Sequence, residues 1–230
     1  MVRVAVVLSG CGFQDGSEIH ESVLALTALD RAGAEVTIAA PVIEIPTIDH
    51  RTGLVQGQPR NCVAESARIA RGKISELWKL SPLDFDALVM PGGYGAAKTL
   101  CDFESRHAAA RVHPILASFV LALHLAQKPI GAICIAPAIV AAVLRDNGIS
   151  ARLSFGNDPQ MASTLRAMGQ ESVDCAVDEC AIDEQRRIVC TPAYMYDARI
   201  SEVAKGIDKL VAAVMRMAAA QAALRPRAPR

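Results

Sequence analysis

The sequence predicts an α/β fold with three layers, in which helices cover both faces of a mostly parallel sheet. Short runs of β-branched and apolar residues alternate with amphipathic stretches of helical length along the whole chain, as expected for a sheet buried on both faces. Apolar residues make up 52% of the 230 residues and aromatic residues only 4%, which predicts a core of Ala, Val, Ile and Leu. No linker marks a second domain. We therefore expect one domain over residues 1–224 and a disordered basic tail over residues 225–230.

The first half of the chain predicts three core strands. Residues 2–9 are nearly all β-branched or apolar, and residues 36–40 and 83–90 form similar runs. Between the first two runs, residues 18–32 place apolar side chains at helical spacing. Ser17, just before them, is a residue type that caps helix N-termini.

The segment between the second and third strands is expected to be irregular. Several prolines and glycines in residues 41–59 predict an excursion or hairpin. Residues 61–71 predict a short helix, and residues 77–80 a possible edge strand.

The second half of the chain predicts further alternating elements. An Ala-rich helix is expected over residues 108–127, starting anew near Pro114. The later elements expected are a strand at residues 153–155, a helix at residues 159–168, a hairpin within residues 176–187, a strand at Ile188–Thr191 and a closing helix over Ile200–Ala223.

Residues 128–138, KPIGAICIAPA, predict a cysteine at a sharp turn between a strand and a helix. The apolar run that ends at Ile133 indicates a short buried strand. Pro137 suits the first turn of a helix because its missing N–H would have no partner there. Cys134 would lie at the positive end of the helix dipole, which favours a thiolate and lowers the thiol pKa. The alternative is a packing cysteine, since free cysteines are often buried.

Turns after three of the strands are candidates for one site. They contain Gly10, Gly92 with Gly93, and Cys134, and sites in such sheets lie outside the carboxyl ends of the strands. The backbone N–H groups of Gly93 and Ile135 could stabilise an oxyanion. The other residues expected to line the pocket are Gly10, Cys11 and Gly92.

Two glutamates of the first helix are candidate proton partners for the cysteine. Glu18 and Glu21 lie one turn apart on the same face, whereas His20 points elsewhere. A carboxyl buried beside a thiolate would have a raised pKa and could donate a proton. Each glutamate could instead be a solvated acid that complements the helix dipole. All five histidines precede Cys134, so no triad with a downstream histidine is available.

Charge, hydropathy and cysteine spacing argue against a nucleic-acid-binding, membrane-spanning or metal-binding protein. The 24 basic and 24 acidic residues cancel, and no basic stripe predicts nucleic-acid binding. No apolar run reaches membrane-spanning length without a charge or a breaker. The seven cysteines lack the spacing of a metal site. Their odd number and scatter indicate reduced thiols, from which we expect a cytoplasmic protein with no metal.

Four motifs, found in order, carry a resemblance to a known family. LSGCGFQDGSEIHE (residues 8–21), MPGGYGAAK (90–98), GAICIAPA (131–138) and TPAYMYDARISEVAKGIDKLV (191–211) resemble the ES1-like, or enhancing lycopene biosynthesis, branch of the ThiJ/PfpI superfamily. This resemblance implies a flavodoxin-like, class I glutamine amidotransferase-like sandwich with Cys134 as nucleophile. It also implies that a first-helix glutamate bonds the cysteine, and the matching position is Glu21, with Glu18 as the alternative.

The resemblance further implies a cofactor-free glyoxalase that acts on small aldehydes or dicarbonyls and forms a homodimer. Cys134 would form a hemithioacetal, and a 2-hydroxy acid would be released. The alternative is a non-catalytic, redox-sensing or partner-binding protein linked to isoprenoid biosynthesis, in which the same thiolate is oxidised reversibly. Glutaminase activity is not expected, because Thr191-Pro192-Ala193-Tyr194 stands where amidotransferases have their histidine and glutamate.

Overall fold

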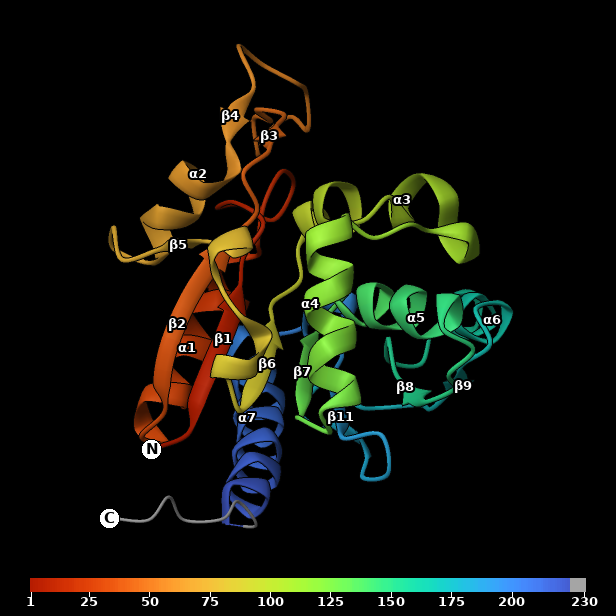
Figure 1. Cartoon of the computed structure of the whole chain (residues 1–230). Coiled ribbons are helices and arrows are strands. Elements are labelled where there is room, and N and C mark those ends of the chain that lie inside the picture. The colour runs from red at the N-terminus through yellow and green to blue at the C-terminus, as the bar shows by residue number, and fades with distance from the viewer. Residues whose placement is uncertain (224–230) are drawn as a thin grey trace.

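The computed structural model describes residues 1–223, and the expected basic tail lies outside the described residues. A seven-stranded sheet has the order β10-β11-β7-β6-β1-β2-β5 and is parallel throughout except between β10 and β11 (Figure 1). The predicted α/β class with a mostly parallel sheet is therefore confirmed. The strands are β1 (Arg3–Val7), β2 (Glu35–Ala40), β5 (Ser75–Glu76), β6 (Ala87–Met90), β7 (Ile130–Ile133), β10 (Ala181–Asp183) and β11 (Ile188–Thr191).

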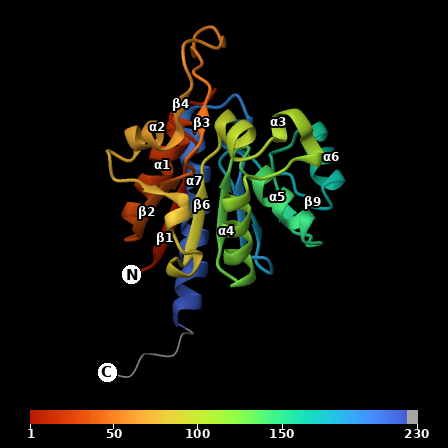
Figure 2. The same ribbon diagram turned by 45° about the horizontal axis from the view of Figure 1, so that its top comes forward.

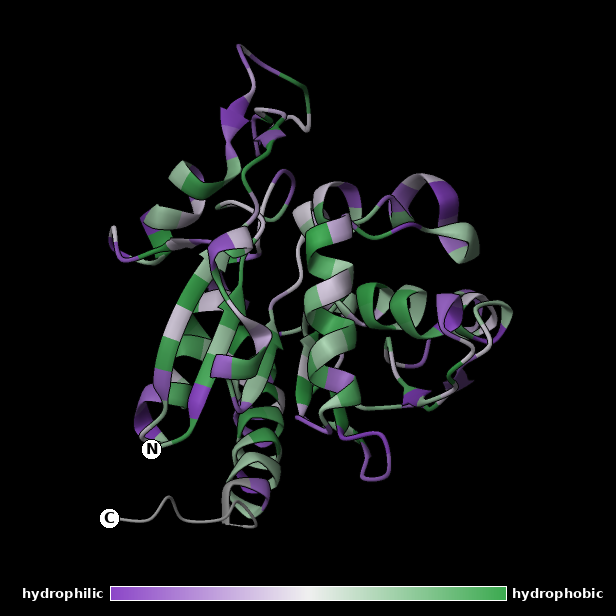
Figure 3. Cartoon of the chain, viewed as in Figure 1, coloured by the Kyte–Doolittle hydropathy of each residue, from purple (hydrophilic) through white to green (hydrophobic). Residues whose placement is uncertain are grey.

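Helices cover both faces of this sheet, which gives the predicted three layers (Figures 1 and 2). On one face α4 and α5 pack on β6 and β7, and on the other face α1 and α7 pack on each other and on the sheet. The central strands are mainly hydrophobic (Figure 3), and their side chains on both faces are buried. The helices are α1 (Ile19–Arg31), α2 (Cys62–Ile69), α3 (Phe103–Arg106), α4 (Pro114–Leu125), α5 (Pro137–Asp146), α6 (Pro159–Ala167) and α7 (Ile200–Ala223).

Two short strand pairs lie outside the main sheet. β3 (Glu44–Ile45) pairs antiparallel with β4 (Arg60–Asn61) and forms the base of the expected excursion. β8 (Arg152–Leu153) pairs with β9 (Glu171–Ser172), so the strand expected at residues 153–155 does not join the main sheet. The hairpin expected within residues 176–187 is displaced: β10 pairs antiparallel with β11, the strand expected separately at Ile188–Thr191.

The first helix begins one residue later than expected and has a different cap. Glu18, rather than Ser17, is the N-cap, and its carboxylate accepts a hydrogen bond from the backbone N–H of Glu21 at 2.7 Å. The Ser17 hydroxyl instead accepts from the N–H of Ser9 at 2.9 Å. Ser17 therefore holds the end of β1 against the start of α1.

Two other elements differ from expectation, and a third begins at the expected proline. Pro82–Asp84 forms a 3-10 turn behind the capping hydroxyl of Ser81, so β6 begins only at Ala87. Leu77–Lys79 is also a 3-10 turn, not an edge strand. The Ala-rich helix begins at Pro114, after a separate 3-10 turn, because the residue before a proline is driven out of helical conformation.

No helix among residues 1–223 is long and apolar enough to cross a membrane. In the same residues, no group of three or more His, Cys, Asp or Glu side chains is placed to hold a metal ion.

Candidate active site

Cys134 lies in a tight turn between β7 and α5. The strand ends at Ile133 and the helix begins at Pro137, which occupies the first helical turn. Cys134 itself has a φ of +60°, a conformation that residues other than glycine adopt at an energetic cost and often at functional sites. The turn brings the sulfur to the carboxyl edge of the sheet, next to the end of β6.

Gly92 makes room for this turn. A Cβ atom at Gly92 would lie 2.6 Å from the Cβ of Cys134 and 2.9 Å from the carbonyl oxygen of Ile133. Both distances are shorter than side chains tolerate, so only glycine lets the loop after β6 approach the cysteine this closely. The next residue, Gly93, has a φ of +92°, which glycine adopts without penalty.

Glu21, not Glu18, is the glutamate that reaches the cysteine. Its side chain is completely buried, accepts a hydrogen bond from the N–H of Gly92 at 2.8 Å and interacts with the thiol of Cys134. Glu18 caps α1 and lines the cavity instead. The helix spacing alone could not tell which glutamate contacts Cys134. In the structure, Glu21 contacts the thiol and Glu18 lies at the start of α1.

Burial governs the electrostatics of the Glu21–Cys134 pair. Burial and the nearby charge of Glu18 raise the pKa of Glu21 from 4.5 to about 8, against the hydrogen bonds that favour its ionised form. Burial and the Glu21 carboxylate also raise the pKa of Cys134, while the N–H groups of Gly93 and Ile135 act to lower it. The prediction that the helix terminus lowers this pKa is therefore wrong, because desolvation outweighs the backbone N–H donors at the turn.

A cavity of about 320 Å³ opens over Cys134. Cys134 is 7% exposed, so the cavity reaches its side chain. The cavity is lined by Phe13, Glu18, Gly93, Tyr94, Ala97, Phe103, Glu104, His107, Cys134, Ile135, Met161, Tyr194 and Met195. Of the residues predicted for the site, Cys134, Glu18, Gly93 and Ile135 line this cavity, while Glu21 and Gly92 lie directly behind it.

Gly10 and Cys11 do not line the cavity, so the prediction that they do is wrong. The N–H of Gly10 donates to the hydroxyl of Ser66 at 2.8 Å, toward α2. Cys11 lies within the electrostatic influence of Arg68 and Glu65, and burial raises its pKa. β1 ends at the same edge of the sheet as β6 and β7, but of the loop that follows it Phe13, not Gly10 or Cys11, lines the cavity. All seven cysteines are free.

Tyr194 is a site residue that the sequence reasoning missed. Its backbone N–H interacts with the Glu21 carboxyl, and its ring lines the cavity. Its hydroxyl lies 2.8 Å from Nδ1 of His20, so His20 does point away from Cys134 but contacts a cavity wall. Ala193, just before it, has a φ of +46°. The position of Tyr194 directly after a core strand was the available signal.

His107 is a second missed residue. It comes from the short turn after α3, is exposed and lines the cavity. Its ring stands edge-on to that of Phe103 at 6.2 Å. Nothing in the sequence around it predicts this, because residues 101–113 form short turns whose path depends on the helices beneath them.

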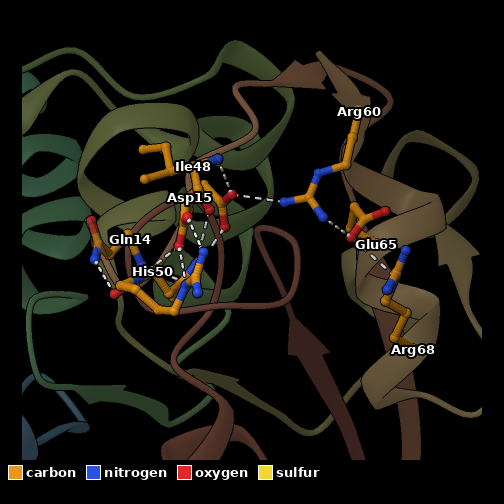
Figure 4. Close-up of polar contacts among 9 residues, drawn as sticks. Gln14, Asp15, Ile48, His50, Arg60, Glu65 and Arg68 are labelled. Atoms are coloured by element: carbon orange, nitrogen blue, oxygen red, sulfur yellow. Dashed lines mark hydrogen bonds and ion pairs between the residues drawn. The ribbon is translucent and has the colours of Figure 1, made fainter. Parts of the chain in front are cut away.

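A polar network joins the loop after β1 to the excursion and to α2 (Figure 4). Asp15 is buried and accepts from Arg60 at 2.7 Å, and Arg60 also pairs with Glu65 on α2 at 2.7 Å. The Arg60–Asp15 pair fastens the excursion between β3 and β4 to the loop after β1. In the same loop, the ring of Phe13 packs edge-on against His50 at 5.3 Å, and Phe13 faces the cavity.

Comparison with known proteins places this arrangement in a family. The model of the DJ-1/PfpI family matches residues 3–194. The human "Glutamine amidotransferase-like class 1 domain-containing protein 3, mitochondrial" is 39% identical over 94% of this chain and 83% of its own length. The rat "ES1 protein homolog, mitochondrial" is 38% identical over 94% of this chain and 84% of its own.

Solved structures show the same fold. A crystal structure from Ehrlichia chaffeensis, described as an isoprenoid biosynthesis protein with an amidotransferase-like domain, has a TM-score of 0.87 and 34% identity, covering 94% of this chain and 99% of that one. The Rapid Encystment Protein of Francisella tularensis shares the fold, with a TM-score of 0.63 at 16% identity over 95% of this chain and 99% of that one.

The comparisons correct one expectation and establish another. Relatives from human, rat and zebrafish are all named as mitochondrial proteins, which contradicts the expected cytoplasmic location. The number and scatter of the cysteines, on which that expectation rested, do not distinguish one compartment from another. The extent of the family match and of these identities establishes that the chain belongs to the DJ-1/PfpI family.

Proposed function

We propose that this protein is a glyoxalase that converts a 2-oxoaldehyde into a 2-hydroxy acid, with water as the only co-reactant. The observation that supports this most directly is the contact between a buried carboxyl and the thiol at the base of the cavity. Such a reaction needs a nucleophile for the aldehyde carbon and an acid–base group that moves a proton between adjacent atoms. Cys134 and Glu21 have these properties.

In the first step, Cys134 attacks the aldehyde. The Glu21–Cys134 pair reacts in the state that has lost one proton, with the remaining proton on Glu21. A bond forms between the sulfur and the aldehyde carbon, and the electron pair of the C=O bond moves to oxygen. Glu21 gives its proton to that oxygen, which produces a hemithioacetal and leaves Glu21 as a carboxylate.

In the second step, Glu21 acts as the base. The carboxylate removes the hydrogen of the sulfur-bearing carbon as a proton and returns a proton to the neighbouring carbon of the enediol. The hydroxyl proton of the first carbon passes to the oxygen of the second, and a 2-hydroxy thioester results. Water then cleaves the C–S bond, releases the 2-hydroxy acid and restores the thiol.

Backbone donors would stabilise the charge that develops on oxygen. The N–H groups of Gly93 and Ile135 interact with the Cys134 sulfur in the free protein. Neither requires movement of a side chain, because both donors are backbone groups and Ile135 directly follows the nucleophile. Fixed donors of this kind are a large contribution to catalysis of carbonyl chemistry.

Conversion of glyoxal to glycolate tests the proposal. Wild type should consume glyoxal and form an equal amount of glycolate, and Cys134→Ser should form none above the uncatalysed rate. Cys11→Ser is the matched control, since Cys11 is a free, half-buried cysteine that does not line the cavity, and it should retain wild-type turnover. The absence of glycolate from the wild-type reaction would contradict the proposal. Reversible oxidation of Cys134 in that case would favour the redox-sensing alternative.

A further inference from the structure

The cavity over Cys134 has apolar and aromatic walls that a two-carbon dialdehyde would not use. Most of its lining side chains are hydrocarbon, aromatic or thioether groups. Two of them, Phe13 and Tyr94, stand at its mouth and are 43% and 50% exposed. Their backbones are joined by a hydrogen bond from the N–H of Tyr94 to the carbonyl of Phe13 at 2.6 Å. Large aromatic side chains left exposed around a reactive group indicate a surface that a ligand covers.

The deeper walls continue this apolar surface. Phe103 packs against Phe155 at 5.8 Å between ring centres and is almost fully buried, so its position is fixed by the core. Met161, from the first turn of α6, and Met195 also line the cavity, and methionine adapts its shape to irregular apolar ligands. The cavity volume of about 320 Å³ is at the lower end of the range for small-molecule sites, and glyoxal would fill only a fraction of it.

The charges at the cavity disfavour an anionic substrate. Glu18 and Glu104 line it, and no Lys or Arg of residues 1–223 does so. Lys98, which is not part of the lining, pairs with Glu104 at 3.7 Å and lies 4.9 Å from the ring centre of Tyr94. A carboxylate or phosphate on the substrate would therefore meet two carboxylates with no guanidinium or ammonium group in the lining to pair with.

From these walls and charges we infer that the substrate is an uncharged 2-oxoaldehyde with an apolar, aromatic side chain, rather than glyoxal itself or an acidic or phosphorylated aldehyde. The aldehyde carbon meets Cys134 at the base of the cavity, and the side chain lies between Phe13, Tyr94 and Met161. This inference rests on the proposed function for its chemistry, while the selectivity of the cavity stands on its lining.

The first experiment compares initial rates with glyoxal, phenylglyoxal and 4-carboxyphenylglyoxal, each expressed per concentration of unhydrated aldehyde. Phenylglyoxal should give mandelate with a kcat/KM at least roughly tenfold above that for glyoxal, since apolar groups placed in a complementary pocket give discrimination of that size. The carboxylated compound should be roughly tenfold poorer than phenylglyoxal. Equal or higher kcat/KM for glyoxal, or for the carboxylated compound, would overturn the inference.

A charge variant tests the electrostatic part. Glu104→Gln removes one of the two lining carboxylates and should raise the ratio of kcat/KM for 4-carboxyphenylglyoxal over phenylglyoxal several-fold. Glu184→Gln is the matched control, because Glu184 is also an exposed glutamate in an ion pair, with Arg216, but is not part of the cavity. It should leave the ratio unchanged. A ratio that responds equally to both substitutions would contradict a local effect of Glu104.

Binding of unreactive analogues separates this inference from the proposed reaction. Calorimetry should show that 2-hydroxyacetophenone binds wild type at least roughly tenfold more tightly than hydroxyacetone or 4-carboxy-2-hydroxyacetophenone does. Met161→Gln should reduce the preference for 2-hydroxyacetophenone over hydroxyacetone. If no dicarbonyl is turned over but these binding preferences hold, the reaction is wrong and the cavity assignment stands. If dicarbonyls are turned over but these binding preferences are absent, the proposed reaction stands and the inference about the substrate is wrong.

Discussion

The carboxyl of Glu21 lies against the thiol of Cys134 in a space almost closed to water, with Glu21 completely buried and Cys134 7% exposed. Two negative charges cannot both be stable at this separation and burial, so the groups titrate as a coupled pair. In the state that has lost one proton, the remaining proton can reside on either group. This provides the nucleophile and the acid of the first catalytic step within one pair of side chains.

Replacing the two glutamates separately should give different results. Glu21→Gln keeps the shape of the side chain but cannot transfer a proton between substrate atoms, so turnover should fall by roughly a hundredfold or more. Glu18→Gln retains an oxygen that can cap α1 and should reduce turnover only a few-fold. Glyoxal or phenylglyoxal consumption by both variants measures this. Loss of activity in Glu18→Gln alone would reverse the roles assigned to them.

The pH dependence of kcat/KM should show an ascending limb near pH 8. Burial raises the pKa of Glu21 to about 8, and below that pH the pair holds both protons and lacks a thiolate. Activity should therefore be low at pH 6 and rise as the first proton leaves. Because the Glu18 charge also contributes to the raised pKa of Glu21, Glu18→Gln should move the limb to lower pH. A rate that is constant from pH 5 to 9 is incompatible with this pair.

The same pKa predicts how stability depends on pH. Glu21 has a folded-state pKa of about 8 against 4.5 as its ordinary value, so the unfolded chain releases this proton at lower pH than the folded protein. The contribution of Glu21 to stability is complete below pH 4.5 and is lost progressively as the pH rises to 8. The loss is up to about 5 kcal/mol, at about 1.4 kcal/mol per pKa unit.

Urea unfolding of wild type and Glu21→Gln at pH 5 and pH 8 checks this expectation. The glutamine does not ionise, so the variant should gain stability relative to wild type between the two pH values. A difference that does not change with pH would show that Glu21 has an ordinary pKa in the folded protein.

Removing Arg60 should weaken both the fold and the cavity wall. Arg60→Met leaves the buried Asp15 carboxylate without its ion pair, and breaking such a pair from one side lowers the free energy of unfolding by about 3 kcal/mol. Because the pair holds the loop that contains Phe13, KM should also rise. Arg68→Met is the control: its side chain is 64% exposed, so its effect should stay below about 1 kcal/mol. Equal destabilisation by the two variants would refute the special role of Arg60.

Gly92→Ala should abolish activity by displacing the nucleophile. The added Cβ would come within 2.6 Å of the Cβ of Cys134, so the turn after β6 or the Cys134 turn has to move. Gly33→Ala is the control, because no atom lies within 4 Å of the added Cβ there and only its positive φ is strained, at about 1–2 kcal/mol. Circular dichroism should show both variants folded, with activity lost only in Gly92→Ala. Full activity of Gly92→Ala would show that the close approach is not required.

Much of the fold follows from patterns that depend only on neighbouring residues. The apolar runs that become β1, β2, β7 and β11, and the helical spacing of α1 and α7, lie close to their predicted positions, because burial on both faces leaves a strong hydrophobic signal. Pro137 marked the start of α5 and so placed Cys134 in its turn. The errors lie where a local hydrogen bond competes with the pattern, as when Glu18 rather than Ser17 caps α1.

The sequence by itself determined which residue types could react and which strand ends carry them, since these depend on composition and spacing. Only the tertiary structure decided that Glu21 meets Cys134 while Gly10 and Cys11 do not line the cavity, and that Tyr194 and His107 do. It also reversed the expected direction of the Cys134 pKa shift. Contacts between distant segments and the removal of water from a side chain are set by how the layers pack, and no local pattern encodes the depth of burial that controls a pKa.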